Sequence, residues 1–180
     1  MEIKLYFGKE YNMYIKEIKI SNFRNFRDAS VPFHEGVNVI IGHNNTGKSN
    51  LLRAIGLVLG YSDGRRLGTC DLFYETDVVT LQQQSPRIKI TLIFHRSQGE
   101  ALDSAEMGLF SGMMTDPALS EEAKLRYEFK LADDQEDNYK ADVAGVTTAK
   151  EIWKIIDRDY IRLYRSSRSG GNQAAGISVN

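Results

Sequence analysis

The stretch VNVIIGHNNTGKSNLLRAIGLVLG, from Val37 to Gly60, places a short polar loop between two apolar runs. The first run, Val37–Ile41, is almost continuously apolar, which is typical of a strand covered on both faces in a parallel sheet. The second run, Leu51–Leu59, is apolar nearly all round and predicts a buried helix. Gly60 suits the left-handed position that ends a helix. The predicted order is therefore strand, loop, helix.

The loop itself, residues 42–49 and here called the glycine loop, has the spacing G-x-x-x-x-G-K-[ST]. Gly42 and Gly47 permit backbone dihedrals that a side chain would forbid, so the main chain can curl around an anion. Main-chain amides and the positive end of the next helix would face that anion. Lys48 adds a positive charge for the β and γ phosphates, and Ser49 offers a hydroxyl to Mg²⁺. The loop therefore predicts nucleotide binding, whereas a simple turn with a surface lysine would leave both apolar runs unexplained.

Strands are also predicted elsewhere by short apolar and alternating patterns. Residues Tyr14–Ile20 are rich in Ile and Tyr, and a second strand follows them and ends near Phe33. Residues 87–94 and 125–131 alternate between apolar and polar side chains, which is the period of a half-buried strand. Residues 81–86 are expected to form a solvated loop.

The C-terminal third predicts a helix over Ala149–Asp157, because Thr148 and Glu151 have the spacing of a capping box. A short strand over 160–164 is expected after it. Residues 132–138, ADDQEDN, predict an acidic turn that leads into a partner strand.

Composition excludes several classes of function. The chain has 180 residues, of which 42% are hydrophobic and 26% charged, and a formal net charge of −1, so no global basic field indicates nucleic acid. Cys70 is the single cysteine, so no internal disulfide is possible, and the three histidines lack ligand spacing. No apolar run reaches the ~20 residues that span a bilayer, and the N-terminus lacks a secretory pattern. We therefore expect a cytoplasmic protein without a membrane partner.

The glycine loop and the segment before it also carry a family resemblance. The sequence IKEIKISNFRNFRDASVPFHEGVNVIIGHNNTGKSNLLRAI resembles the N-terminus of the RecF/SMC-type branch of ABC ATPases, and within it OLD (overcoming lysogenisation defect) nucleases. The resemblance rests on SNFRNF and GHNNTGKSNLL and covers residues 14–59. It implies an α/β P-loop NTPase fold: the first lobe of an ABC-type ATPase, with a mixed sheet and an antiparallel β elaboration. It also implies ATP and Mg²⁺ as cofactors.

The same resemblance assigns binding roles to individual residues. Arg24 and Asn25 would lie near the base, ribose or α phosphate, although Arg24 could equally be an ordinary surface charge. Ser49 would bind the Mg²⁺ that accompanies ATP. The residues that would line the triphosphate are Gly42, His43, Asn44, Asn45, Thr46, Gly47, Lys48, Ser49 and Asn50.

Parts needed for phosphoryl transfer are missing from the sequence. The family places a carboxylate pair after a strand of four apolar residues, and no such stretch occurs here. Asp157, in WKIIDRD, is the nearest candidate, but its setting predicts a helix. Ser167–Gln173 resembles the family's signature motif, yet a flexible Gly/Ser tail is the better interpretation. Catalytic residues therefore stay unassigned. Hydrolysis would require downstream segments and a second ATPase lobe or homodimer partner, and DNA would be contacted through those segments.

The expected organisation is an ATPase lobe over residues 13–165 with an insertion at about 95–120. Residues 1–12 would be an extra strand, a dispensable extension or a misplaced start, and residues 166–180 a flexible tail. Two alternatives to an ATPase component stay open. One is a nonhydrolysing, nucleotide-bound scaffold. The other is a GTPase or a small kinase. The sequence contains neither the N/T-K-x-D motif that a GTPase would need nor the clustered arginines that a kinase would need.

Overall fold

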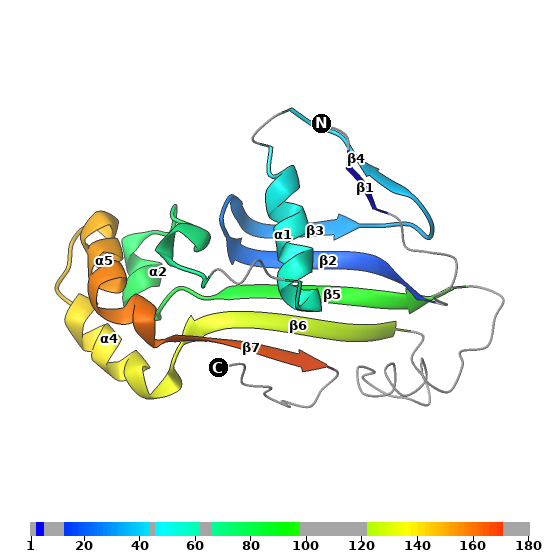
Figure 1. Cartoon of the computed structure of the whole chain (residues 1–180). Coiled ribbons are helices and arrows are strands. Elements are labelled where there is room, and N and C mark those ends of the chain that lie inside the picture. Colours follow the sequence, from blue (N-terminus) through cyan, green and yellow to red (C-terminus); the bar gives the residue numbers. More distant parts are fainter. Residues whose placement is uncertain (1–2, 6–12, 44–45, 62–65, 98–121, 171–180) are drawn as a thin grey trace.

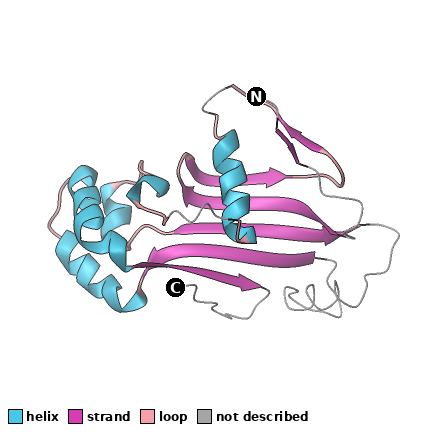
Figure 2. Cartoon of the chain, in the orientation of Figure 1, coloured by secondary structure: helices cyan, strands magenta, loops and turns pink. Residues whose placement is uncertain are grey.

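The computed structural model has a mixed α/β architecture built on a five-stranded antiparallel sheet (Figure 1). The strand order is β3-β2-β5-β6-β7, and β1 pairs with β4 in a separate two-stranded ribbon. Helix α1 crosses one face of the large sheet, while α2, α4 and α5 gather at one end (Figure 2). The structure describes residues 3–5, 13–43, 46–61, 66–97 and 122–170.

The elements have the following bounds. The strands are β1 (Ile3–Leu5), β2 (Met13–Phe23), β3 (Phe26–Pro32), β4 (Asn38–Ile40), β5 (Ile88–Arg96), β6 (Glu122–Leu131) and β7 (Tyr164–Gly170). The α-helices are α1 (Lys48–Leu59), α2 (Val78–Gln83), α4 (Glu136–Val143) and α5 (Ala149–Ile155). Short turns of helix are η1 (Thr69–Asp71), η2 (Asp133–Gln135), η3 (Ile156–Tyr160, a π-helix) and η4 (Ile161–Leu163).

The alternating patterns are confirmed as strands β5 and β6 and the Ile- and Tyr-rich segment as β2, and β3 ends next to the predicted position. Ile20 on β2 lies opposite Ile90 on β5, which lies opposite Tyr127 on β6, and all three are buried. Lys19 and Thr91, one residue away on β2 and β5, pair on the opposite face of the sheet. Alternation therefore gives the sheet one apolar face and one polar face.

Helix α1 packs on the apolar face and completes the core. It is less uniformly buried than its composition predicts, because Leu52, Arg53 and Gly56 keep partial exposure. It ends as predicted at Gly60, whose φ of 84° is left-handed. Its buried positions are Lys48, Leu51, Ala54, Ile55, Leu57 and Val58.

The apolar strand before the glycine loop differs from the prediction. Only Asn38–Ile40 form a strand, β4, and its described pairing is antiparallel, with β1. Val39 is 45% exposed and Ile41 84% exposed, so burial on both faces is wrong for the described residues. The apolar composition of this run predicted that its side chains are buried, but β4 is not part of the five-stranded sheet, and Val39 and Ile41 do not pack into its core. The pairing of β1 also shows that part of the segment 1–12 forms a strand.

The strand expected at 160–164 is wrong, because the helix continues through η3 and η4 and β7 begins only at Tyr164. Ile156 and Tyr160 are both buried, and the wide π turn keeps them on the packed side. Packing thus overrides the strand preference of this Ile- and Tyr-rich stretch. Residues 166–170, expected in the tail, pair with β6 as part of β7.

The acidic stretch 132–138 forms η2 and the start of α4, where a turn and a partner strand were predicted. Tyr139 and Val143, four residues apart, are completely buried and lie on one side of α4. Acidic residues in the first turn also suit the positive end of a helix. The acidic residues therefore begin a helix instead of a hairpin.

Residues 81–86 are likewise more structured than predicted. Leu81 is buried in α2, and Gln82 Nε2 donates hydrogen bonds to carbonyl oxygens at and beyond the C-terminus of α4, 2.9 Å from Val146 O. Gln82 therefore caps a neighbouring helix and is not a solvated loop residue. The insertion expected at about 95–120 lies almost wholly outside the described residues, as does the end of the tail, 171–180.

Candidate anion-binding loop

The glycine loop leads directly into α1, as the sequence predicts. Lys48 is the first residue of α1 and only 7% exposed. Its Nζ donates to the carbonyl oxygens of Gly42 and His43, both at 2.5 Å. Thr46 closes the loop further, because its Oγ1 donates to His43 O at 2.9 Å. The lysine is therefore aimed into the loop, while Asn44 and Asn45 lie outside the described residues.

The start of α1 is electrostatically suited to an anion. The first turn of the helix contains no acidic residue, so the positive end of its dipole is not neutralised by its own side chains. Ser49 is exposed in that turn, where its hydroxyl is accessible. A buried ammonium, an exposed hydroxyl and a helix N-terminus are thus grouped within one turn.

Gly47 explains why the loop requires glycine at this position. Its φ is 97°, a conformation that side-chain-bearing residues rarely adopt. A Cβ atom there would lie 2.5 Å from Asn25 Nδ2 and 3.1 Å from Phe26 Cζ. The turn between β2 and β3 therefore lies directly against the glycine loop. Residues distant in sequence, predicted to meet the same ligand, are adjacent in the fold.

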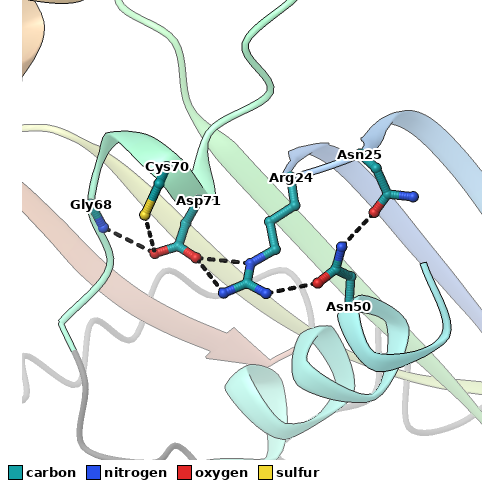
Figure 3. A network of polar contacts seen from close by, with 6 residues as sticks. All are labelled: Arg24, Asn25, Asn50, Gly68, Cys70 and Asp71. Atoms are coloured by element: carbon teal, nitrogen blue, oxygen red, sulfur yellow. Dashed lines mark hydrogen bonds and ion pairs between the residues drawn. The ribbon is translucent and has the colours of Figure 1, made fainter. Parts of the chain in front are cut away.

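A polar network joins this turn to α1 and to η1 (Figure 3). Arg24 Nε and Nη2 donate to Asp71 Oδ1 at 2.9 and 2.8 Å, and Arg24 Nη1 donates to Asn50 Oδ1 at 2.7 Å. Asn50 Nδ2 then donates to Asn25 Oδ1 at 2.7 Å. We call Asp71, Arg24, Asn50 and Asn25 the Arg24 relay. Arg24 is therefore a network residue, and the surface-charge interpretation is wrong.

Asp71 is the member of this network that the sequence did not reveal. It is completely buried, and its other oxygen, Oδ2, accepts from the Gly68 amide at 3.1 Å. A single aspartate between Cys70 and Leu72 has no local pattern that marks it. Asp71 becomes part of the site only because folding brings it into contact with Arg24, which is 47 residues away in the sequence.

Other candidate residues lie elsewhere. Asp157 is exposed in η3, where its Oδ1 accepts from Thr69 Oγ1 at 2.6 Å, so it joins η3 to η1. Ser167 lies in β7, while the last residues of the signature-like motif are outside the described part. Within residues that the structure describes, no group of three or more His, Cys, Asp or Glu side chains could hold a metal ion.

Three tyrosines in or next to the helices at the end of the sheet have strongly raised pKa values. Burial, reinforced by a hydrogen bond to Asp142, raises the pKa of Tyr160 to about 12. Burial alone is the main reason that the pKa values of Tyr139 and Tyr164 rise well above the ordinary value. These shifts reflect packed phenols and mark no acid–base centre.

Sequence comparisons identify relatives of this chain. RecF, the DNA replication and repair protein, from Streptococcus suis (strain 05ZYH33) is 32% identical over 88 residues, covering 49% of this chain and 22% of RecF. RecF from Caldanaerobacter subterraneus subsp. tengcongensis is 56% identical over 46 residues, covering 26% of this chain and 13% of that protein. The chain spans roughly a fifth or less of the length of these relatives.

Two solved structures also match. A recombination mediator RecF–ATP structure in the RecFOR pathway has 28% identity and a TM-score of 0.42, covering 67% of this chain and 25% of that chain. An SMC ATPase structure, from a study of ATP-driven dimerisation and DNA-stimulated activation, has 19% identity and a TM-score of 0.43. The match covers 79% of this chain and 77% of that chain.

A family model described as an AAA ATPase domain matches residues 13–165. Among the described residues, no helix is long and apolar enough to cross a membrane. The described residues have a mixed α/β architecture. The chain therefore belongs to the AAA ATPase domain family, with similarity to RecF-type ATPases.

Proposed function

We propose that the glycine loop binds the triphosphate of ATP together with Mg²⁺. The observation that carries this proposal is Lys48, a buried ammonium at the start of α1 whose Nζ is held by the loop's own carbonyl oxygens. An incoming phosphate would replace these neutral acceptors with charged ones, and hydrogen bonds between charged groups are roughly twice as strong. Ser49, exposed beside it, would supply a hydroxyl to the metal ion.

The remaining predicted residues fit around the same loop. Amides from Gly42 to Asn50 would surround the phosphates, as in other P-loops. Asn25 packs against Gly47, so the turn that carries Arg24 and Asn25 would approach the nucleotide from the side of β2 and β3. This position supports the assignment of both residues to the binding site.

Hydrolysis requires groups that the described residues do not supply at the loop. Phosphoryl transfer needs a carboxylate near Mg²⁺ and a group that orients water, and the nearest sequence candidate, Asp157, accepts a hydrogen bond from Thr69 in η1. We therefore propose that residues 13–165 act as the nucleotide-binding lobe of a larger ATPase. Additional segments and a second lobe would complete the site, with ATP joining two copies.

The RecF relatives support a role in DNA processing or repair for the complete assembly. Contact with DNA would then be made outside the described residues. Membership of the OLD branch, with its associated nuclease and anti-phage activity, is the more specific form of this proposal.

A nonhydrolysing scaffold is the second candidate, and the engagement of Asp157 by Thr69 favours it for this chain alone. In that case ATP would stabilise the fold without turnover. Phosphate release separates the candidates, because a scaffold binds Mg²⁺–ATP and releases no phosphate even at high protein concentration.

Calorimetric titration with Mg²⁺–ATP tests the binding site. Lys48→Ala should weaken binding about 10- to 100-fold, as expected for losing a charged hydrogen bond. Lys140→Ala, on the exposed surface of α4, is the matched control and should bind as the wild type does. Equal affinity for the wild type and the Lys48 variant would exclude the glycine loop as the phosphate site.

A further inference from the structure

Asp71 is a buried carboxylate whose ion pair with Arg24 leads toward the glycine loop. Its side chain has no exposed surface, whereas the side chain of Arg24, its partner, is 25% exposed. A buried carboxylate requires hydrogen-bonded or charged partners. Asp71 has both, since Arg24 donates twice to Oδ1 and the Gly68 amide donates to Oδ2. The ion pair thus connects the core to the partly exposed edge of the site.

The relay fixes the direction of each hydrogen bond in turn. A guanidinium has donors only, so the oxygen of the Asn50 amide must face Arg24. The Asn50 nitrogen then faces Asn25 and donates to its oxygen. The Asn25 nitrogen is left pointing at Gly47, where it would meet a Cβ at 2.5 Å. The buried charge of Asp71 therefore determines which end of Asn25 is presented to the loop (Figure 3).

The backbone of the turn is held independently of the side chains. Arg24 has a φ of 52° and Asn22 a φ of 55°, both left-handed. The Arg24 amide donates to Asp71 O at 2.9 Å, and the Phe73 amide donates to Asn22 O at 3.0 Å. These main-chain bonds do not involve the Asp71 carboxylate. A change confined to that carboxylate therefore leaves the backbone attachment of the turn in place.

We propose that Asp71 is a positioning residue for nucleotide binding, acting through Arg24 and Asn50 to hold the Asn25 amide as a donor at the glycine loop. This inference rests on the proposed binding of ATP at that loop. Without the carboxylate, Arg24 loses two acceptor contacts and the orientation of both asparagines is no longer enforced. Asp71 itself touches no nucleotide in this arrangement.

The test is a double-substitution cycle on Mg²⁺–ATP affinity in the whole chain. Asp71→Asn, which preserves side-chain size, should weaken binding about 3- to 10-fold, the effect of one lost hydrogen bond. In an Asn50→Ala background, where the relay is already cut, the same substitution should have no further effect. A purely structural role predicts that the two losses multiply.

Thr69→Ala is the matched control, because Thr69 lies in the same short turn η1 but bonds to Asp157. It should leave ATP affinity unchanged. Unaltered affinity in Asp71→Asn, or independent losses in the double variant, would overturn the inference. If Asp71→Asn does not fold, Asn50→Ala is combined with Asn25→Ala, because these two side chains share a relay hydrogen bond. A double variant that binds no more weakly than the single variants supports the relay, and unchanged binding by Asn50→Ala, or losses that multiply, rejects it.

The two proposals fail differently. Absence of ATP binding by the wild type, or equal binding by Lys48→Ala, refutes the glycine-loop site and the relay with it. Normal dependence on Lys48 with no dependence on Asp71 or Asn50 refutes the relay only.

Discussion

Replacing Gly47 with alanine tests the packing of the glycine loop against the β2–β3 turn. The new Cβ would lie 2.5 Å from Asn25 Nδ2, a distance that forces a displacement. Asn25 is the end of a flexible side chain, but it is tied to Asn50 by a 2.7 Å hydrogen bond. Moving Asn25 therefore breaks that bond.

The expected cost has two separable parts. A side chain at φ 97° strains the backbone by about 1–3 kcal/mol. Displacing Asn25 adds about 1 kcal/mol for the lost hydrogen bond. Gly47→Ala should therefore lower the free energy of unfolding by about 2–4 kcal/mol. In an Asn25→Ala background the clash with Nδ2 disappears, so only the backbone strain and the closer approach to Phe26 stay.

Urea denaturation measures both effects, followed by circular dichroism and by the fluorescence of the single tryptophan, Trp153, which is buried in α5. The double variant should be more stable than the sum of the single effects predicts by about 1 kcal/mol. Additive effects within about 0.3 kcal/mol would show that Asn25 does not lie against Gly47. The placement of the turn beside the loop would then be wrong.

Two further predictions concern the helical end. Tyr139→Phe should lower the free energy of unfolding by about 1–3 kcal/mol, because the Tyr139 hydroxyl donates to Leu81 O at 2.7 Å in the core; an unchanged urea midpoint would contradict this. The pKa of Tyr160 is raised to about 12, so folding favours its protonated form. That stability is complete below the ordinary pKa near 10 and is lost as the pH rises toward 12. Thermal melting from pH 8 to 12 should show a smaller alkaline loss in Tyr160→Phe, and identical pH profiles would disprove the linkage.

Local sequence patterns were sufficient for four of the five strands of the large sheet, β3, β2, β5 and β6, but not for β7. Strands β5 and β6 follow from alternation, because one face of each is more buried than the other, and β2 follows from its Ile- and Tyr-rich composition. The glycine loop and the start of α1 were also predictable, since Gly47 and Lys48 satisfy local requirements of backbone and charge. Local rules identify local structure well.

Features set by distant contacts were not predictable. Helix α4 depends on Tyr139 and Val143 finding a core, and Gln82 becomes a helix cap only because α2 lies beside α4. The exposure of Val39 in β4 depends on which other segments pack against this strand, and composition does not specify those segments. Asp71 belongs to the candidate site only through its contact with Arg24. Each of these features depends on tertiary contacts and has no local sequence pattern that predicts it.

Strand β2 pairs along both edges, and this has a consequence for the order of folding. Its partner β3 follows after a tight turn, whereas its partner β5 brings Ser21 opposite Lys89. Closing the longer connection costs more chain entropy, and such distant pairings slow folding. The hairpin of β2 and β3 can therefore form early. The segment between β3 and β5, which contains the glycine loop and α1, reaches its final structure only when β5 pairs with β2. During refolding, ligand-binding capacity should then return together with the central sheet and not with the hairpin.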